Sequence, residues 1–243
     1  MMRSLEWDSD FFGIKTARID AAKLSGDELS EQLENFQNST FSLLYIFAPH
    51  NLSCHKKEIL SAGGFLTDEK VTFTMNVDSI NPSLSPYIRS CKGSEMDRDL
   101  ETLAIESGKY SRFKVDKRIP RNKFEELYRL WMKNSLNGTF AKEVYAYEDE
   151  GQKLGMITID IRENEGWIGI IAVNETHRGR SIGKLLMHAA IRFCKENKVS
   201  ILNVQTQLEN KVSCAFYEKI GFSVKGVEDV YHVWGVKRDG VTK

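Results

Sequence analysis

Chemistry-bearing residues concentrate between positions 167 and 222, where an apolar predicted strand ends in a loop rich in arginine and glycine. The loop opens a helix that begins at Ser181, and the free N–H groups and dipole of a helix start attract anions. Glycine lets a phosphate approach the backbone closely, and basic side chains add charge. The residues concerned are Arg178, Gly179, Arg180, Ser181, Ile182, Gly183 and Lys184. They predict a site for a phosphate-bearing ligand, with an ordinary Arg/Gly-rich surface loop as the alternative.

Two other phosphate motifs do not account for this loop. A P-loop requires the spacing GxxxxGK[ST], but Gly179 and Gly183 are one residue too close and Leu185 replaces the serine or threonine. The dinucleotide fingerprint GxGxxG is absent, and the preceding strands form predicted hairpins instead of a βαβ unit.

A second group of side chains lies on a helix that is predicted to begin at Asn210 and to end at Gly221. Helical spacing puts four residues on one face: Asn210, Ser213, Cys214 and Tyr217. Asn210 and Tyr217 are then about 10 Å apart, and the small side chains between them predict a trough for a linear ligand. The inward face is predicted to consist of Val212, Phe216 and Ile220.

Tyr217 is the candidate acid of this second group. A phenol of pKa ~10 is reasonably matched to a departing thiol of pKa ~8.5. The alternative is that Tyr217 only packs and that Asn210 only caps its helix. A covalent role for Cys214 is disfavoured because the pattern offers no nearby base.

These two groups resemble the two signatures of the GCN5-related N-acetyltransferase (GNAT) superfamily. Residues 178–183 are similar to its R/Q-x-x-G-x-G/A loop, with Ser181 where the first glycine usually stands, and residues 210–222 to N-x-x-A-x-x-x-Y-x-x-x-GF. The resemblance implies an α/β (α+β) fold with a mixed, mostly antiparallel sheet flanked by helices. It also implies acetyl-CoA as co-substrate, bound by Ile171, Ala172, Val173, residues 178–184 and Asn210, with Tyr217 as general acid and a backbone N–H near Val173 as oxyanion donor.

Shorter motifs resemble the TDP-fucosamine acetyltransferases. They are Leu5-Glu-Trp with Phe11-Phe12-Gly13, Ser111-Arg112-Phe113, Trp131 with Gly138-Thr139-Phe140, and residues 204–210. This resemblance implies that the acceptor is the amine of a nucleotide-activated amino-deoxy sugar used for cell-surface polysaccharide. The alternatives are an N-acetyltransferase for another small amine or a protein N-terminus, and a non-catalytic CoA-binding module.

The remaining candidates are polar residues near the predicted cleft. Arg112, with Phe113, lies in a basic loop over 108–120 and either grips nucleotide phosphates or is simply solvated. Three carboxylates either accept the amine proton through water or are solvated hairpin charges: Asp160, Glu163 and Glu165. The five histidines show no metal-ligand spacing, so no metal is expected.

Composition bounds the partners and the compartment. The 243 residues are 41% hydrophobic and 28% charged, with a net charge of zero, so no global field favours nucleic acid. The four cysteines form no CxxC pair, which favours reduced thiols in the cytoplasm. No apolar signal core begins the sequence, and no apolar run approaches the ~20 residues of a membrane span. The oligomeric state is left open, with a homodimer as one option.

The chain is predicted to consist of a small α/β domain (1–78), a Pro/Ser-rich linker (79–86) and the acetyltransferase domain (87–243). In the first domain we expect strand–turn–strand over 5–19, helix 25–38, strand 41–47, helix 54–62 and strand 71–77. In the second we expect strand 87–91, helices 94–107 and 121–136, strands 142–147, 153–161 and 167–173, a helix from 181, strand 200–206 and helix 210–220.

Overall fold

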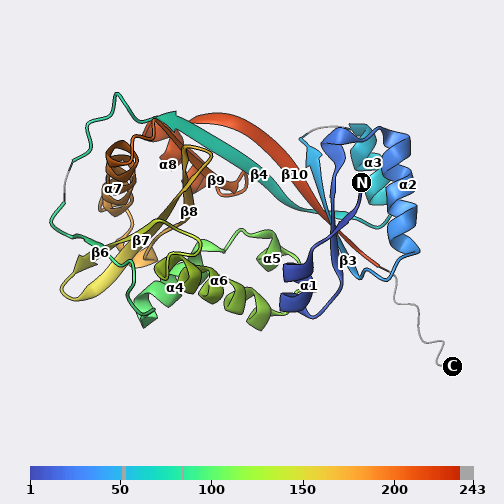
Figure 1. Cartoon of the computed structure of the whole chain (residues 1–243), viewed down its shortest axis with the longest axis horizontal. Coiled ribbons are helices and arrows are strands. Elements are labelled where there is room, and N and C mark those ends of the chain that lie inside the picture. Colours follow the sequence, from blue (N-terminus) through green and yellow to red (C-terminus); the bar gives the residue numbers. More distant parts are fainter. Residues whose placement is uncertain (51–52, 84, 236–243) are drawn as a thin grey trace. The chain divides into compact units, whose positions relative to one another are not determined.

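The computed structural model describes residues 1–50, 53–83 and 85–235. The chain forms two compact units, called unit 1 (residues 1–70, 207–209 and from 227 onward) and unit 2 (residues 71–206 and 210–226). Strands β4 (Phe65–Asn76) and β10 (Ser223–Trp234) contribute residues to both (Figure 1). Unit 1 is discontinuous in sequence because β10 returns to pair with β3. A domain edge at 79–86 stays a prediction.

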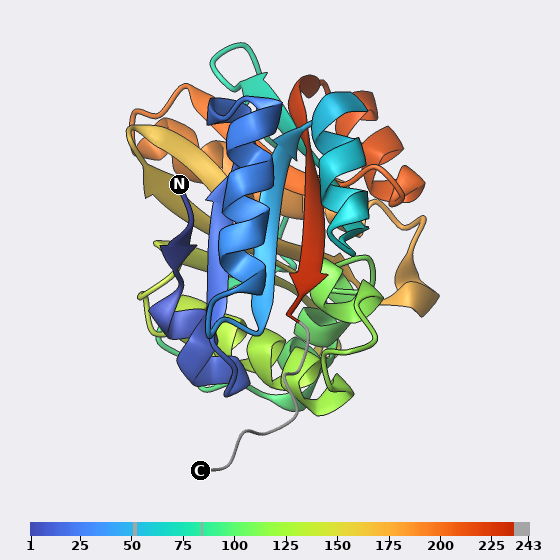
Figure 2. The same ribbon diagram turned by 90° about the vertical axis from the view of Figure 1, so that its right-hand side faces the viewer.

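Unit 1 is a small sheet with helices on one face. The strand order is β1-β2-β3-β10, with β2 parallel and β10 antiparallel to β3. Figure 2 shows α2 and α3 covering the same face of this sheet. The elements are β1 (Arg3–Ser4), α1 (Glu6–Phe12), β2 (Thr16–Asp20), η1 (Ala21–Lys23), α2 (Gly26–Gln37), β3 (Leu43–Pro49) and α3 (Ser53–Ser61).

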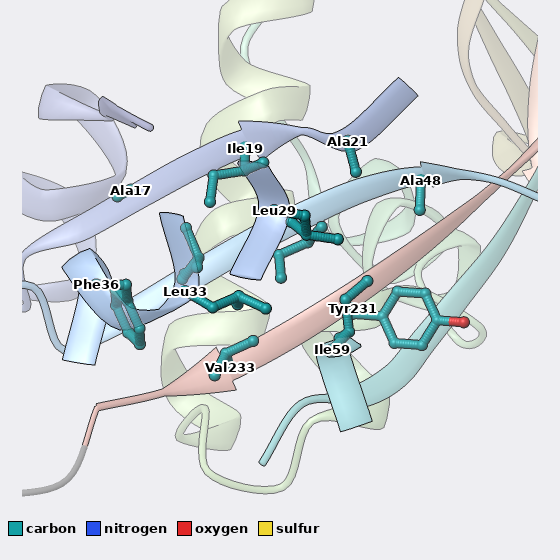
Figure 3. Close-up of a cluster of buried hydrophobic side chains, with 12 residues drawn as sticks. Ala17, Ile19, Ala21, Leu29, Leu33, Phe36, Ala48, Ile59, Tyr231 and Val233 are labelled. Carbon is teal, nitrogen blue, oxygen red and sulfur yellow. The ribbon is translucent and has the colours of Figure 1, made fainter. Parts of the chain in front are cut away.

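The core of unit 1 follows from the amphipathic pattern of α2. Ser25 and Glu28 form a reciprocal capping box that fixes the start of this helix. Its apolar face then buries against β3 and the end of β10 (Figure 3). The buried helix residues are Leu29, Leu33 and Phe36. The predictions of helix 25–38 and strand 41–47 are confirmed to within about two residues, the usual uncertainty of element ends.

The prediction of a strand–turn–strand over 5–19 is wrong in its first half. Residues 6–12 form helix α1, which ends at Gly13 with a positive φ of 69°. Trp7 and Phe11, four residues apart, stack with ring centroids 5.2 Å apart, as i, i+4 neighbours on a helix do. A glycine in the left-handed region ends a helix as readily as it forms a turn, which explains the error.

Unit 2 carries the larger part of the molecule. Its strand order is β4-β9-β8-β7-β6-β5, antiparallel from β5 to β8 and parallel between β8 and β9. Its elements besides β4 are β5 (Ile88–Ser90), α4 (Arg98–Ser107), α5 (Arg112–Val115), α6 (Arg121–Leu136), β6 (Glu143–Asp149), β7 (Gln152–Arg162), β8 (Glu165–Val173), η2 (Glu175–His177), α7 (Ile182–Glu196), β9 (Ile201–Gln207) and α8 (Lys211–Lys219). The predicted mixed, mostly antiparallel α/β architecture is confirmed.

The sheet of unit 2 has a helix layer on each face (Figure 1). A Cβ atom on Gly155 of β7 would lie 2.9 Å from Ile182 and 3.0 Å from Leu186, so this position faces α7. The next residue, Met156, belongs to a hydrophobic cluster that also includes Leu103 of α4 and Met132 of α6. Successive strand residues point to opposite faces, so α7 covers one face and α4 with α6 the other. No described helix is long and apolar enough to cross a membrane.

Candidate functional site

Strands β8 and β9 part from each other halfway along β8. Their parallel pairing joins residues 166–168 to residues 202–204, and no later pair is formed in the described chain. A register shift between β7 and β8 falls at the same level, opposite Ile157 and Ile159. From Ile168 to Val173, β8 continues for five residues, about 16 Å at ~3.3 Å per residue. Along this stretch the edge of β8 that faces β9 has no strand partner, and an extended ligand could lie beside it.

The loop that follows β8 presents an uninterrupted run of backbone donors. Within the described part of the chain, the N–H groups of residues 179–184 make no hydrogen bond, and the first bond of α7 is from Leu185 N to Ser181 O at 3.1 Å. Gly179 and Ser181 have positive φ angles of 81° and 61°, whereas Arg180 does not. Alternation of this kind turns successive N–H groups toward one side and forms an anion-binding concavity.

Ser181 adopts a conformation that favours glycine. It is the N-cap residue of α7, with φ 61° and ψ 9°, and its side chain makes no capping hydrogen bond. A non-glycine residue in this region carries a strain of ~1–3 kcal/mol. The sequence comparison that placed Ser181 at a glycine position therefore identified a real backbone constraint.

The loop, the end of β8 and helix α8 lie against one another. The Arg178 Nε atom donates to the Val173 carbonyl at 3.3 Å. A Cβ atom on Gly183 would lie 3.2 Å from the Phe216 ring and 3.7 Å from Val173, so glycine permits this close approach. The side chains of Arg178, Arg180 and Lys184 are on exposed residues. The structure thus brings together the predicted cofactor positions 171–173 and 178–184.

Asn210 serves as the N-cap of α8. Its Oδ1 accepts a hydrogen bond from Ser213 N at 3.2 Å, and its Nδ2 donates to Thr206 Oγ1 at 3.4 Å. Both polar atoms of the Asn210 side chain are therefore bonded within the protein, as the helix-capping interpretation predicts. A contact of Asn210 with a ligand stays a prediction.

Tyr217 is the buried residue of α8, only 3% exposed. Its ring packs at centroid distances of 5.5 Å from Phe73 and 5.7 Å from Phe222, and its hydroxyl makes no hydrogen bond with any described residue. Burial, together with the nearby Cys214, raises the pKa of the phenol well above its ordinary value. Tyr217 is therefore a weaker acid than the phenol of pKa ~10 assumed from the sequence.

The predicted inward face of α8 is wrong at one position. Val212 is 72% exposed, and Tyr217 takes the fully buried place instead. The rings of Phe73 and Phe222 surround Tyr217, and sequence spacing did not anticipate that pocket. Burial also raises the pKa of the half-buried Cys214 thiol, which disfavours a thiolate there.

The basic loop over 108–120 contains the short helix α5, capped by Ser111. Phe113 is 6% exposed and packs edge-on against Trp131 with centroids 6.1 Å apart. The Arg112 guanidinium lies 4.3 Å from the Phe113 ring centroid. Phe113 is therefore part of the core, while a role for Arg112 or Phe113 in acceptor binding stays a prediction.

Sequence reasoning missed a polar group at the closed end of the β8–β9 pairing. Asn203 of β9 is fully buried, and its Nδ2 donates to Glu165 Oε2 at 2.8 Å and to the Gly166 carbonyl at 3.4 Å. Lys225 Nζ donates to the same Glu165 oxygen at 3.3 Å. The available signal was an asparagine inside an otherwise apolar strand, Ile-Leu-Asn-Val. The sequence offered Glu165 either as a proton acceptor through water or as a solvated hairpin charge, and did not indicate its contact with Asn203.

A second cluster lies in unit 1. Ligand-type atoms of His50, Glu69 and Asp229 all lie within 4.8 Å of one another. The sequence shows no metal-ligand spacing around His50, because strands bring together residues that are distant in sequence; the absence of a metal stays a prediction. His50 Nδ1 is 2.7 Å from Asp229 Oδ1, and Tyr231 donates to Asp229 Oδ2 at 3.4 Å. These contacts already satisfy His50 and Asp229 as a hydrogen-bonded pair.

The site combines a loop with free backbone N–H groups and a pair of strands that part beside it. Residues 109–222 match the model of the acetyltransferase (GNAT) family. The match covers 114 of the 243 residues, just under half of the chain, and over this part the chain is similar to a family of acyltransferases that use acetyl-CoA.

Individual relatives are distant. The spore coat polysaccharide biosynthesis protein SpsD of Bacillus subtilis is 28% identical over 132 residues, 54% of this chain but only 45% of that protein. A putative ribosomal protein bS18-alanine N-acetyltransferase of the same organism is 27% identical over 106 residues, 42% of this chain and 70% of that protein. A GCN5-related N-acetyltransferase from Sphaerobacter thermophilus superposes with a TM-score of 0.61 at 13% identity, covering 97% of this chain and 77% of that chain, which supports the fold alone.

Proposed function

We propose that this protein transfers the acetyl group of acetyl-CoA to the amine of a nucleotide-activated amino-deoxy sugar of the TDP-fucosamine type. The observation that carries the proposal is the run of free N–H groups over residues 179–184 beside the unpaired edge of β8. Six donors at a helix start suit a pyrophosphate, and the parted strands suit an extended arm that ends in a thioester.

The residues fit acetyl-CoA in three places. The pyrophosphate would lie on the loop, held by its N–H groups and by the charges of Arg178, Arg180 and Lys184. The extended arm would follow β8 along Ile171, Ala172 and Val173. Asn210, at the start of α8, would contact the arm from the other side while it caps its helix.

The proposed reaction is direct transfer. The lone pair of a neutral amine attacks the thioester carbonyl carbon, and a C–N bond forms while a backbone N–H near Val173 stabilises the oxyanion. The C–S bond then breaks, Tyr217 gives its phenolic proton to the departing sulfur, and the amine nitrogen loses one proton to a carboxylate or water. A phenol is protonated at neutral pH, so Tyr217 is available as a donor, although its raised pKa makes it a weaker acid.

The acceptor class rests on two kinds of support. One is the set of short motifs shared with the TDP-fucosamine acetyltransferases, and the other is the match to SpsD, whose name refers to polysaccharide biosynthesis. We infer a cytoplasmic site of action, where acetyl-CoA and nucleotide sugars are available and where the free thiols of Cys91 and Cys194 would stay reduced. No metal is part of the proposed step, and a homodimer stays one option.

The test measures how much free CoA thiol is released from acetyl-CoA in the presence of each acceptor in a panel. We expect release with TDP-fucosamine to exceed release with simple amino sugars and with peptides. If another amine is much the better acceptor, the sugar-nucleotide assignment fails and the acetyltransferase assignment stands.

A protein N-terminus is the second candidate acceptor, because the matched putative alanine N-acetyltransferase is covered over 70% of its length. A peptide beginning with alanine belongs in the panel for this reason. Acetyl-CoA binding without thiol release from any acceptor would instead support a non-catalytic CoA-binding module.

A further inference from the structure

One buried polar atom of unit 2 has no partner. The side chain of Asn203 is fully buried, and its Oδ1 accepts no hydrogen bond from any described residue. Leaving a buried acceptor unsatisfied costs ~1–3 kcal/mol, so a fold does not retain one without compensation. Nothing in the acetyl-CoA site as described above uses this atom.

The orientation of the Asn203 amide is fixed by chemistry. Its nitrogen faces two acceptors, a Glu165 carboxylate oxygen at 2.8 Å and the Gly166 carbonyl at 3.4 Å. A flipped amide would turn its own oxygen toward both acceptors, which is repulsive. The nitrogen therefore belongs on the side of residues 165–166, and Oδ1 points the other way.

That direction leads toward the parted strands. Asn203 pairs with Trp167, one rung before the last β8–β9 pair at Ile168 and Val204. Because the two strands are parallel, the side away from residues 165–166 is the side on which the pairing ends. Oδ1 thus lies at the inner end of the unpaired stretch of β8, residues 169–173, whose other end leads to the 178–184 loop.

The face of the sheet is also defined. Asp160, Trp167 and Asn203 are aligned across β7, β8 and β9 and share a face. Alternation along β7 puts Asp160 on the same face as Met156, which packs in the core under α4 and α6. The row formed by Asp160, Trp167 and Asn203 therefore lies on the face of the sheet opposite α7, the helix that follows the 178–184 loop.

The row is rich in acceptors and poor in free donors. The Asp160 carboxylate is held by Arg162 at 3.0 Å, and the Arg162 guanidinium lies 6.0 Å from the Trp167 ring centroid. Only one oxygen of the Glu165 carboxylate is engaged, by Asn203 and Lys225. An incoming group that donates protons, an amine or ammonium, complements this arrangement.

We propose that Asn203 is a positioning residue for the acceptor amine: its Nδ2 fixes the Glu165 carboxylate, and its Oδ1 receives a hydrogen bond from the amine nitrogen. This inference rests on the proposed acetyl transfer and assigns the acceptor end of that site. The acceptor ammonium loses one proton to water, and the neutral amine then keeps its lone pair for the thioester. Asn203 itself gains and loses no proton.

The experiment replaces Asn203 by leucine, which has a similar shape and no hydrogen-bonding group. We expect the KM for the amine to rise about tenfold, with a smaller change in kcat and no change in the calorimetric affinity for acetyl-CoA. Gln37→Leu is the matched control, because Gln37 on α2 of unit 1 also has a buried amide oxygen without a partner among the described residues, and its Nε2 donates to the Ala62 carbonyl at 3.4 Å. Asn203→Ala is the second variant should leucine prevent folding.

Acceptor binding is measured separately, by calorimetry of TDP-fucosamine and of the alanine peptide with the enzyme saturated in CoA. Weaker amine binding by Asn203→Leu supports the inference even when the wild type transfers no acetyl group, an outcome that would contradict the proposed function alone. Equal amine KM and equal amine affinity in wild type and Asn203→Leu overturn the inference, whether or not acetyl transfer occurs. A wild type that binds no amine overturns it as well.

Discussion

The loop over residues 178–184 and helix α8 are built in opposite ways. Residues 178–181 and Lys184 of this loop are exposed, and the proposed binding groups are backbone N–H groups that form no hydrogen bond within the described chain. On α8 the proposed acid is a side chain, Tyr217, that is buried among aromatic rings and has a raised pKa. One region depends on backbone conformation, whereas the other depends on packing.

This difference separates binding from chemistry. Changes of side chain in the loop leave most of its donors in place, because each residue still contributes its N–H group. A change at Tyr217 removes the only hydroxyl that α8 buries. We therefore expect large, selective losses of turnover from α8 and graded losses of affinity from the loop.

The largest effect is expected for Tyr217→Phe. If Tyr217 protonates the departing thiolate, kcat should fall ~10²- to 10⁴-fold, while the dissociation constant of acetyl-CoA stays unchanged. Because the hydroxyl has no hydrogen-bond partner among the described residues, thermal stability should barely move. In the wild type, the raised pKa predicts no alkaline loss of kcat from this group until the pH exceeds ~10.

The control for Tyr217→Phe is Tyr145→Phe on β6. Burial raises the pKa of Tyr145 to about 12, so it matches Tyr217 in character but lies away from α8. Its turnover should equal that of the wild type. Equal turnover in both variants would remove Tyr217 as the acid.

An intermediate effect is expected for Lys184→Met in the loop. Loss of one charge-assisted phosphate contact of ~1.5–3 kcal/mol should weaken acetyl-CoA binding about tenfold or more, with a smaller salt dependence than the wild type. Calorimetry at two salt concentrations measures both. Lys219→Met, at the far end of α8, is the control, and an equal loss there would show that only overall charge matters.

A smaller effect is expected from substitution by glycine, which should change the free energy of unfolding in opposite directions in the two regions. Ser181→Gly relieves the positive φ of 61° and should stabilise the protein by about 0.5–1 kcal/mol after the added freedom of the unfolded chain is counted. Ser213→Gly, inside α8, should instead destabilise it by ~0.5 kcal/mol. Denaturant unfolding measures both, and destabilisation by Ser181→Gly would contradict the strained N-cap.

The smallest effect concerns the outer face of α7. Ser83 N donates to His188 Nδ1 at 2.8 Å, so His188 is neutral, and burial followed by the charge of Lys184 lowers its pKa. The unfolded chain, with a His pKa of ~6.5, then binds more protons at acid pH. The contribution of His188 to the free energy of unfolding is therefore present above pH ~6.5 and is lost as the pH falls below that value. His188→Gln should flatten the pH dependence of unfolding, and an unchanged slope would exclude His188 as its source.

The sequence predicts the backbone-built region better than the packed one. The arginines, the glycines and Ser181 are adjacent in the chain, so their common role can be read locally, and helix 121–136 begins and ends as expected because one amphipathic pattern determines it. The burial of Tyr217 depends on packing against aromatic rings such as that of Phe73. The contact of Asn203 with Glu165 joins residues that are 38 positions apart in the sequence. No local pattern contains that information.

The most direct test of the central claim is amide NMR of the free N–H groups in the loop during titration with acetyl-CoA. We predict that the amides of residues 179–184 shift and become protected from exchange, together with those of residues 169–173. The amides of the hairpin turn at Glu163 and Asn164, which lies outside the loop, should not change. Binding of acetyl-CoA that leaves the 179–184 amides unshifted and unprotected would contradict the account.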